Sequence, residues 1–234
     1  VHGIDDPSAF TTRFALVPVA DLTIEDTWHT SGMRATGSHT VVVDDVVVPA
    51  ERTCSGDELR GSGAGADDDR LSALPLLSVL ALTASAPAVG AAEAAVGLAG
   101  DQARSRILAY TLGERAADQP HVRARLASVT SDLETTRAGW WAAIDEIGGA
   151  DRPSDELRAR TRLAAAAAVR SSRRIIGDVA EGAGASVYFE SHPLQRLQRD
   201  VETLKGHVVF DWDRTTELAG RVLLGQPLQP TDMA

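Results

Sequence analysis

Cysteine is almost absent from this sequence: Cys54 is the single one among 234 residues. An internal disulfide is therefore excluded, and a reducing cytoplasm is the compartment that we expect. Cys54 lies in a stretch rich in serine, glycine and aspartate, without an apolar run that would form a pocket. For this reason we do not expect it to be a catalytic thiol.

The sequence also lacks a long apolar run and an excess of positive charge. Its most apolar stretch, residues 71–100, is interrupted by prolines, small residues and Glu93, so it predicts a buried helix and no membrane span. The formal net charge of -10 argues against nucleic acid or an anionic membrane as the main partner. No histidine, cysteine or carboxylate cluster has metal-site spacing, and no glycine-rich phosphate loop follows a strand pattern.

The chain changes character about a quarter of the way along. Residues 1–54 are rich in valine and threonine without a helical period, which predicts β-structure. Residues 55–70 have little to bury and an excess of glycine and aspartate, which is typical of a linker. Residues 71–234 show helical periods. The predicted fold is mainly α, with a partial β-barrel or sheet module before an antiparallel four-helix bundle.

The first two of four long helices are bounded by prolines and glycines. The first is expected from about Pro75 to about Tyr110, with a kink at Pro87. The second begins near Pro120 and ends at residues 148–149, a pair of glycines.

A serine and a proline mark the starts of the other two helices. Ser154 is an expected N-cap for the third helix, whose alanine-rich middle favours close packing. The fourth helix follows Pro193 and is expected to continue through Val208, because apolar residues recur at intervals of three and four up to that position. Arg199 and Asp200 are interpreted as an ion pair that ties this helix to its neighbours.

Residues 26–53 contain a tryptophan, a Gly-Met-Arg triplet and a Thr-Gly-Ser triplet before a valine-rich strand that ends in Val-Pro. These are Trp28, residues 32–34, residues 36–38 and residues 48–49. In this order they resemble the flavin-facing half of the middle β domain of the acyl-CoA dehydrogenase fold. The similarity is to the branch used by the oxygenase components of two-component flavin-dependent monooxygenases.

A second stretch, "GAGASVYFESHPLQRLQRD" at residues 182–200, resembles the loop and last helix of the same family. There a small-residue turn with an aromatic leads into Pro-Leu-x-Arg-x-x-Arg-Asp, and a histidine follows seven residues later, here His207. Residues 91–141 resemble the first two helices of the family's bundle. The resemblance thus covers nearly the whole chain, and it implies the second half of a β domain followed by the C-terminal helical bundle.

The resemblance implies a bound reduced flavin, FMN or FAD. An isoalloxazine ring needs a flat apolar wall, hydrogen bonds at its edge and positive charge for its phosphate. Trp28 is expected to supply the wall, Thr36 and Ser38 the hydrogen bonds, and Arg34 or Arg106 the charge. The alternatives are that Trp28 is a strand-packing aromatic and that the two hydroxyls belong to ordinary turns.

Four further positions are expected near the cofactor or substrate. The resemblance places Gly184 and Ser186 in the loop that contacts the cofactor, and Tyr188 and Trp140 at the border of a substrate cavity. The alternative for Trp140 is a core position, because one tryptophan of an adjacent helical pair is normally buried.

His207 is the expected catalytic residue. It borders the apolar seam of the predicted fourth helix, with Asp200, Thr203 and Asp211 within helical reach. The resemblance implies a position near the flavin N5 edge, where an imidazole could stabilise negative charge on the flavin or transfer a proton. The alternative is a capped, half-buried helix histidine.

The resemblance implies an oxygenase that takes reduced flavin from a separate reductase and uses O2 to oxygenate a small aromatic, polyketide or amino-sugar substrate. It also implies a homotetramer or dimer. The alternative within the fold is an acyl-CoA dehydrogenase, which needs a carboxylate base. At the two expected base positions the sequence has Val208 and Leu80, and Glu190 is out of register.

A different class of function is a non-catalytic helical assembly module. The N-terminal helical domain and first half of the β domain of the resembled fold have no counterpart here, and the chain begins at Val1. We therefore expect a fragment, or a processed piece, whose β module needs another segment or chain to cover its strand edges.

Overall fold

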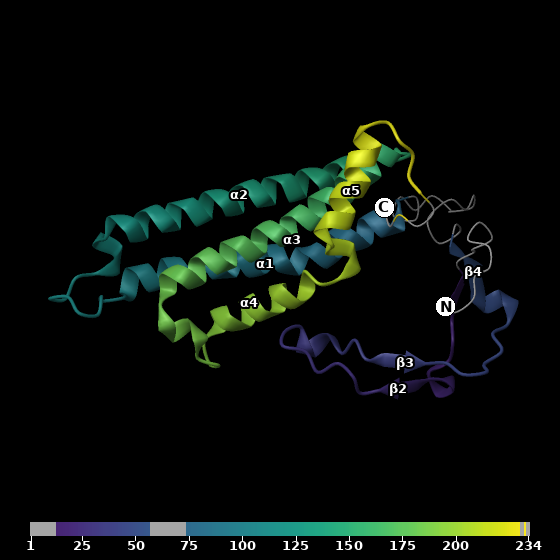
Figure 1. Cartoon of the computed structure of the whole chain (residues 1–234), viewed down its shortest axis with the longest axis horizontal. Helices are drawn as coiled ribbons and strands as arrows, with labels where there is room; N and C mark the ends of the chain where they lie inside the picture. The colour runs from purple at the N-terminus through teal and green to yellow at the C-terminus, as the bar shows by residue number, and fades with distance from the viewer. Residues whose placement is uncertain (1–12, 57–73, 230–231, 233–234) are drawn as a thin grey trace.

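The structure is a computed structural model that describes residues 13–56, 74–229 and 232. Most of the predicted linker therefore lies outside the described residues. The described part contains five α-helices and two small sheets, with the helices forming the bulk of the molecule (Figure 1). The prediction of a mainly α fold with an antiparallel bundle is confirmed.

Helix α3 (Asp155–Ala183) occupies the centre of the bundle. It contacts α1 (Leu76–Ser105), α2 (Pro120–Gly149), α4 (Pro193–Leu204) and α5 (Trp212–Leu223), and Figure 1 shows α1, α2 and α4 running beside it. Its alanines permit this close packing, because a helix with small side chains brings neighbouring axes together. Most of its buried positions are apolar and belong to one continuous core.

The start of α3 and both ends of α2 follow the sequence signals. Ser154 caps α3, because its side chain accepts a hydrogen bond from the N–H of Leu157 at 3.2 Å. Helix α2 begins at Pro120 and ends at Gly149, as predicted. Helix α1 ends at Ser105, five residues before the predicted end, and Pro87 lies inside it without ending it.

Helix α1 has the length and hydropathy that a membrane-spanning helix would also have. It forms part of the core here, since Ala81, Ala88, Ala92 and Ala95 are fully buried against the other helices. Its packing therefore agrees with the interpretation of residues 71–100 as a buried helix.

The fourth helix is shorter than predicted and a fifth helix follows it, which corrects the sequence-based expectation. Helix α4 ends at Leu204, and a short 3-10 helix, η8 (Val208–Phe210), leads into α5. Gly206 lies in the turn between them, and its N–H donates to the carbonyl oxygen of Thr203 at 3.1 Å. Glycine has a low helix propensity, and α4 ends before Gly206 although the apolar spacing continues to Val208.

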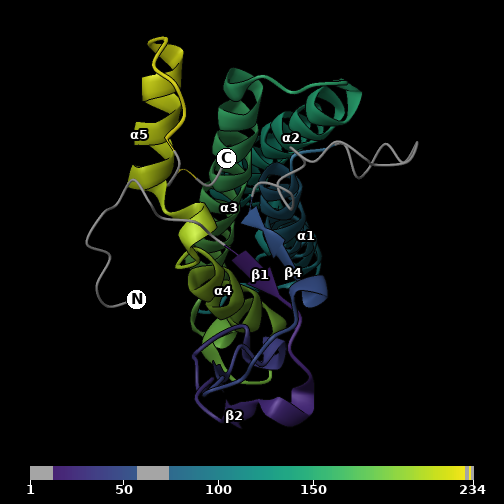
Figure 2. The same ribbon diagram turned by 90° about the vertical axis from the view of Figure 1, so that its right-hand side faces the viewer.

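The β module consists of two separate antiparallel pairs. Strand β1 (Arg13–Ala15) pairs with β4 (Thr53–Ser55), and β2 (Thr23–Glu25) pairs with β3 (Thr40–Val42). All residues of β1, β2 and β3 are exposed. The second pair lies alongside α4, away from α2 (Figures 1 and 2).

Candidate functional site

The loop between β2 and β3 docks on α4 through backbone groups. The N–H of Met33 donates to Asp200 Oδ1 at 2.6 Å, and Arg199 Nη1 donates to the carbonyl oxygen of Ser31 at 3.0 Å. The predicted tie between the last helix and its surroundings therefore exists. Its form differs from the predicted ion pair, because both side chains bind the loop backbone.

Gly32 lies at the closest approach between this loop and α4. A Cβ at this position would be 2.0 Å from the carbonyl oxygen of Arg199, far inside van der Waals contact. Any side chain would displace the loop, so close packing alone explains the glycine of the Gly-Met-Arg triplet.

A cavity of about 580 Å³ opens where the loop meets the bundle. Its volume falls within the range of small-molecule sites. Arg34 and Thr36 line it from η3 (Arg34–Thr36). An apolar wall comes from four residues of α1: Pro87, Ala88, Gly90 and Ala91. Helix α4 supplies two charged side chains, Arg196 and Asp200, and three apolar ones: Leu197, Val201 and Leu204.

Trp28 and Ser38, the other two residues predicted to face the flavin ring, are not among the residues that line this cavity. Trp28 is half-buried, and its indole N–H donates to the carbonyl oxygen of Met33 at 2.9 Å. Thr36 Oγ1 donates to the same carbonyl at 2.8 Å and lies 3.4 Å from Ser38 Oγ. The structure thus gathers Trp28, Arg34, Thr36 and Ser38 around Met33, with Arg34 and Thr36 at the cavity.

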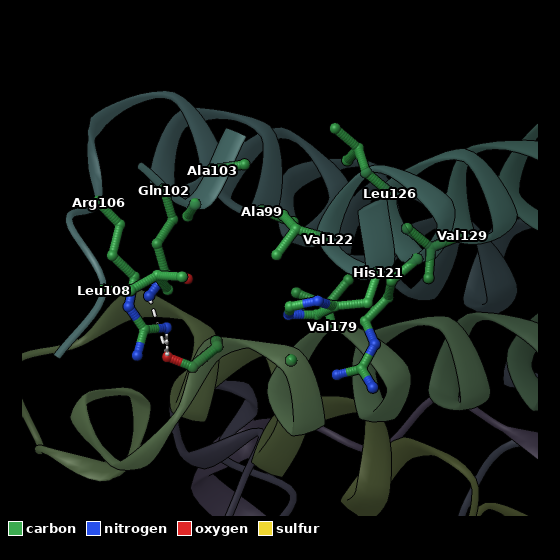
Figure 3. A pocket seen from close by; sticks show the side chains of 14 residues that line it. Ala99, Gln102, Ala103, Arg106, Leu108, His121, Val122, Leu126, Val129 and Val179 are labelled. Atoms are coloured by element: carbon green, nitrogen blue, oxygen red, sulfur yellow. Dashed lines mark hydrogen bonds between the residues drawn. The ribbon is translucent and has the colours of Figure 1, made fainter. Parts of the chain in front are cut away.

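A second, smaller cavity of about 220 Å³ lies where α1, α2 and the end of α3 meet. Arg106 Nη1 and Gln102 Nε2 donate to the carbonyl oxygen of Ala183 at 2.8 and 3.0 Å. Figure 3 shows Arg106 and Gln102 on one side of this cavity and His121 on the other. Gln102 lies in the last turn of α1, and Arg106 is the extended residue that follows the helix, with its N–H bonded to the carbonyl oxygen of Gln102.

Two glycines make room for the arginines of this cavity. A Cβ at Gly182 would be 2.6 Å from Arg125 Nη1, and one at Gly184 would be 3.1 Å from Arg106 Nη2. Gly184 also has a φ of +80°, which side-chain-bearing residues rarely adopt. Arg106 and Gly184, each predicted to contact the cofactor, therefore lie against each other.

The small cavity suits an anionic group. Arg106, Arg125 and His121 all line it, and none of its described lining residues is a carboxylate. Guanidinium groups bind phosphate oxygens through several N–H donors at once. Gln102, His121 and Arg125 were not predicted, and only the spacing of Gln102 from Arg106 could have indicated one of them.

The remaining predicted residues lie outside these two cavities. Ser186 and Tyr188 are exposed in η7 (Ala185–Tyr188), the short helix between α3 and α4. Trp140 lies on α2, where its indole N–H donates to Ser85 Oγ at 2.8 Å. Trp140 packs against the core and borders another small cavity, between α2 and α3.

His207 lies outside any α-helix, which corrects the helical position predicted for it. It is the N-cap of η8, and its Nδ1 accepts a hydrogen bond from the N–H of Val209 at 3.2 Å. The side chain is exposed, with its ring centroid 6.0 Å from that of Phe210. Asp211 instead caps α5 by accepting from the N–H of Arg214 at 3.0 Å. The predicted helical face shared by His207 and Asp211 does not form.

Helix α4 lies between the two predicted loop residues, Gly184 and Ser186, and the predicted catalytic residue, His207. Gly184 and Ser186 precede its first residue, and His207 follows its last. Twelve residues of α-helix span about 18 Å, so His207 and the Arg106 cavity lie well apart. The large cavity lies along α4 between them and includes Leu204, three residues before His207.

Comparison with known proteins gives one matching family model, the acyl-CoA dehydrogenase C-terminal domain, over residues 82–212. The chain is 32% identical over 227 residues to the flavin-dependent monooxygenase oxygenase subunit HsaA of Rhodococcus jostii. It is 28% identical over 228 residues to the FADH2-dependent resorcinol hydroxylase oxygenase component of a Rhizobium species. These matches cover 92% and 91% of this chain, and 58% and 56% of the relatives.

Among solved structures, XiaF from a Streptomyces species in complex with FADH2 and glycerol superposes with a TM-score of 0.86 at 30% identity. The match covers 94% of this chain and 57% of XiaF. The chain therefore spans a little more than half the length of the proteins that it matches.

Proposed function

Because this chain belongs to the acyl-CoA dehydrogenase C-terminal domain family, we propose that it forms the C-terminal part of the oxygenase component of a two-component flavin-dependent monooxygenase. The observation that supports this most directly is the cationic cavity at Arg106, Arg125 and His121, combined with a larger, mainly apolar cavity beside α4. Together they offer the two environments that a flavin requires, one for phosphate and one for a flat ring.

The residues present fit a reduced flavin, either FMN or FAD. Its bound ring would supply the reaction with O2, and the protein would supply binding, orientation and exclusion of water. The Arg106 cavity is the proposed phosphate site, where Gly182 and Gly184 leave room for the guanidinium groups. Arg34 and Thr36 are the proposed contacts of the ring cavity, and Trp28 supports their loop from behind.

His207 remains the proposed catalytic residue, and the role that we propose for it is the donation of a single hydrogen bond. Its Nδ1 is occupied by the N–H of Val209, so Nε2 is the nitrogen that faces outward. From that atom the imidazole can donate one hydrogen bond to a negatively charged partner in the active site.

The residues at the two expected base positions argue against the alternative function, an acyl-CoA dehydrogenase of the same fold. Such an enzyme needs a carboxylate where this chain has Val208, or on the first bundle helix, where it has Leu80. The main chain of Val208 is fixed by Arg162 and its side chain is aliphatic. Proton abstraction next to a thioester carbonyl would therefore have no base at either position.

For the substrate we propose a small aromatic compound, since a relative is named a resorcinol hydroxylase. A separate flavin reductase is the proposed partner, because the relatives are named oxygenase subunits or components. We further propose cytoplasmic assembly as a dimer or tetramer, in which the exposed strands β1, β2 and β3 would be covered.

Anaerobic titration of the chain with reduced and oxidised FMN and FAD tests the proposal. We expect tighter binding of the reduced form, and oxygenation of a phenol when O2 is admitted. His207→Ala should bind flavin normally but form less oxygenated product. If neither form of either flavin binds, the flavin proposal is wrong for this chain, and a helical assembly module becomes the better explanation.

A further inference from the structure

Arg162 is a buried arginine in the N-terminal part of the central helix α3. It lies on α3 among alanines, and only 2% of its surface is exposed. Desolvation is the main cause that lowers the pKa of its guanidinium, with nearby Arg214 acting in the same direction. Burying a cation is costly unless hydrogen bonds compensate, so its partners indicate what it is for.

Arg162 donates to two consecutive main-chain carbonyls of η8. Nε donates to the carbonyl oxygen of Val209 at 2.8 Å, and Nη2 donates to that of Val208 at 3.1 Å. A charged donor forms stronger hydrogen bonds than a neutral one, and a planar guanidinium fixes both acceptors in one orientation. Arg162 thereby anchors η8 to the central helix.

The anchored segment also orients His207. The N–H of Val209 donates to His207 Nδ1 at 3.2 Å, and the N–H of Phe210 donates to the carbonyl oxygen of His207 at 2.8 Å. A neutral imidazole has one N–H and one acceptor nitrogen. Since Nδ1 accepts, the hydrogen lies on Nε2. The peptide units on either side of Val209 therefore link the guanidinium to the imidazole.

We propose that Arg162 is a positioning residue that acts through η8 to hold His207 as the Nε2–H tautomer with its donor facing outward. The inference rests on the proposed function and deepens it, because it defines how the proposed catalytic histidine is presented. Arg162 itself touches neither cavity, so its effect on a reaction would pass through Val208, Val209 and His207.

Imidazole 15N NMR of the flavin-free chain at pH 8 tests this directly, because that pH is above the ordinary histidine pKa of about 6.5. In the unsubstituted chain His207 should show an acceptor-type Nδ1 and a protonated Nε2. Arg162→Met preserves most of the volume and removes the donors. It should produce a mixture of tautomers and reduce hydrogen-exchange protection of the Val209 amide about tenfold or more. Arg162→Lys should restore part of both signals.

Ile176→Val is the matched control, since Ile176 is fully buried on the same helix and its truncation weakens the core without touching η8. It should leave the His207 tautomer unchanged. A dominant Nδ1–H tautomer in the unsubstituted chain would overturn the proposal, and that measurement needs no variant to fold. An unchanged tautomer in Arg162→Met would also overturn it.

Oxygenation assays then separate this inference from the proposed function. If flavin binds and a phenol is oxygenated, Arg162→Met should lose turnover as His207→Ala does, while its flavin affinity stays the same and Arg162→Lys recovers part of the rate. If no oxygenation occurs with any chain, the monooxygenase proposal fails. The NMR result would still decide whether Arg162 sets the tautomer of His207.

Discussion

The main-chain N–H of Met33 lies 2.6 Å from Asp200 Oδ1, and this hydrogen bond joins the β module to α4. Asp200→Ala should therefore destabilise the docked loop by about 1.5–3 kcal/mol, the usual contribution of a hydrogen bond to a charged group. Hydrogen exchange at the Met33 amide measures this locally. Gln198→Ala, two residues earlier on α4, is the control and should leave that amide protected. Equal protection in both variants would contradict the importance of the bond.

Gly32 should be intolerant of a side chain for a separate reason. In Gly32→Ala the new methyl group would meet the carbonyl of Arg199, and overpacking of this kind typically costs about 1–3 kcal/mol. Gly97→Ala is the opposite case, because a Cβ added there would have nothing within 4 Å and the residue sits inside α1. That variant should gain about 0.5–1 kcal/mol. Urea unfolding of the two variants compares them, and a neutral Gly32→Ala would disprove the close approach.

Arg106→Gln should weaken flavin binding by removing charge from the small cavity. The loss of a charge-assisted hydrogen bond predicts a roughly 10- to 100-fold higher Kd for reduced flavin. Arg104→Gln is the matched control, since Arg104 is an exposed neighbour that pairs with Asp101. Its Kd should remain within about twofold, as is usual for exposed ion pairs. If both variants bind alike, the phosphate site lies elsewhere.

Glu202 should make a small contribution to stability that depends on pH. Burial alone would raise the pKa of Glu202, but hydrogen bonds from Lys205 and Arg173 outweigh it and lower this pKa below the ordinary value. A lowered folded-state pKa stabilises the protein above the unfolded glutamate pKa of about 4.3, and the benefit disappears as pH falls through the folded value.

Glu202→Gln should accordingly lower the Tm at pH 7, and this difference in Tm should shrink as the pH falls below the unfolded glutamate pKa of about 4.3. The side chain is 39% exposed, so the effect should be at most about 1 kcal/mol. Thermal unfolding at a series of pH values provides the test. A difference between the two chains that grows as the pH falls would have the wrong sign.

Helix starts were readily predicted because their signals are local. Ser154 caps α3 with its own side chain, and Pro120 and Pro193 occupy first-turn positions, so neighbouring residues suffice to locate them. The end of α4 at Leu204 was missed because the apolar spacing continues to Val208. The low helix propensity of Gly206 was the local signal against a longer helix.

The partners of the polar side chains that join distant segments could not be predicted. The sequence indicated that Arg199 and Asp200 were structural, but their partners lie in a loop near residue 32, which no local pattern identifies. The burial of Arg162 could not be predicted either, because an arginine in an alanine-rich helix is ordinarily exposed. Its function becomes visible only when η8 is folded against α3.

The bond between Met33 and Asp200 joins residues that are 167 positions apart. Bringing such distant segments together carries a loop-closure cost in entropy, while the contacts among consecutive helices close much shorter loops. The bundle can therefore assemble first and present a finished α4 surface to the strands. Docking of the β module should then be the last event of folding and the first to reverse, so this junction can open while the helical core stays intact.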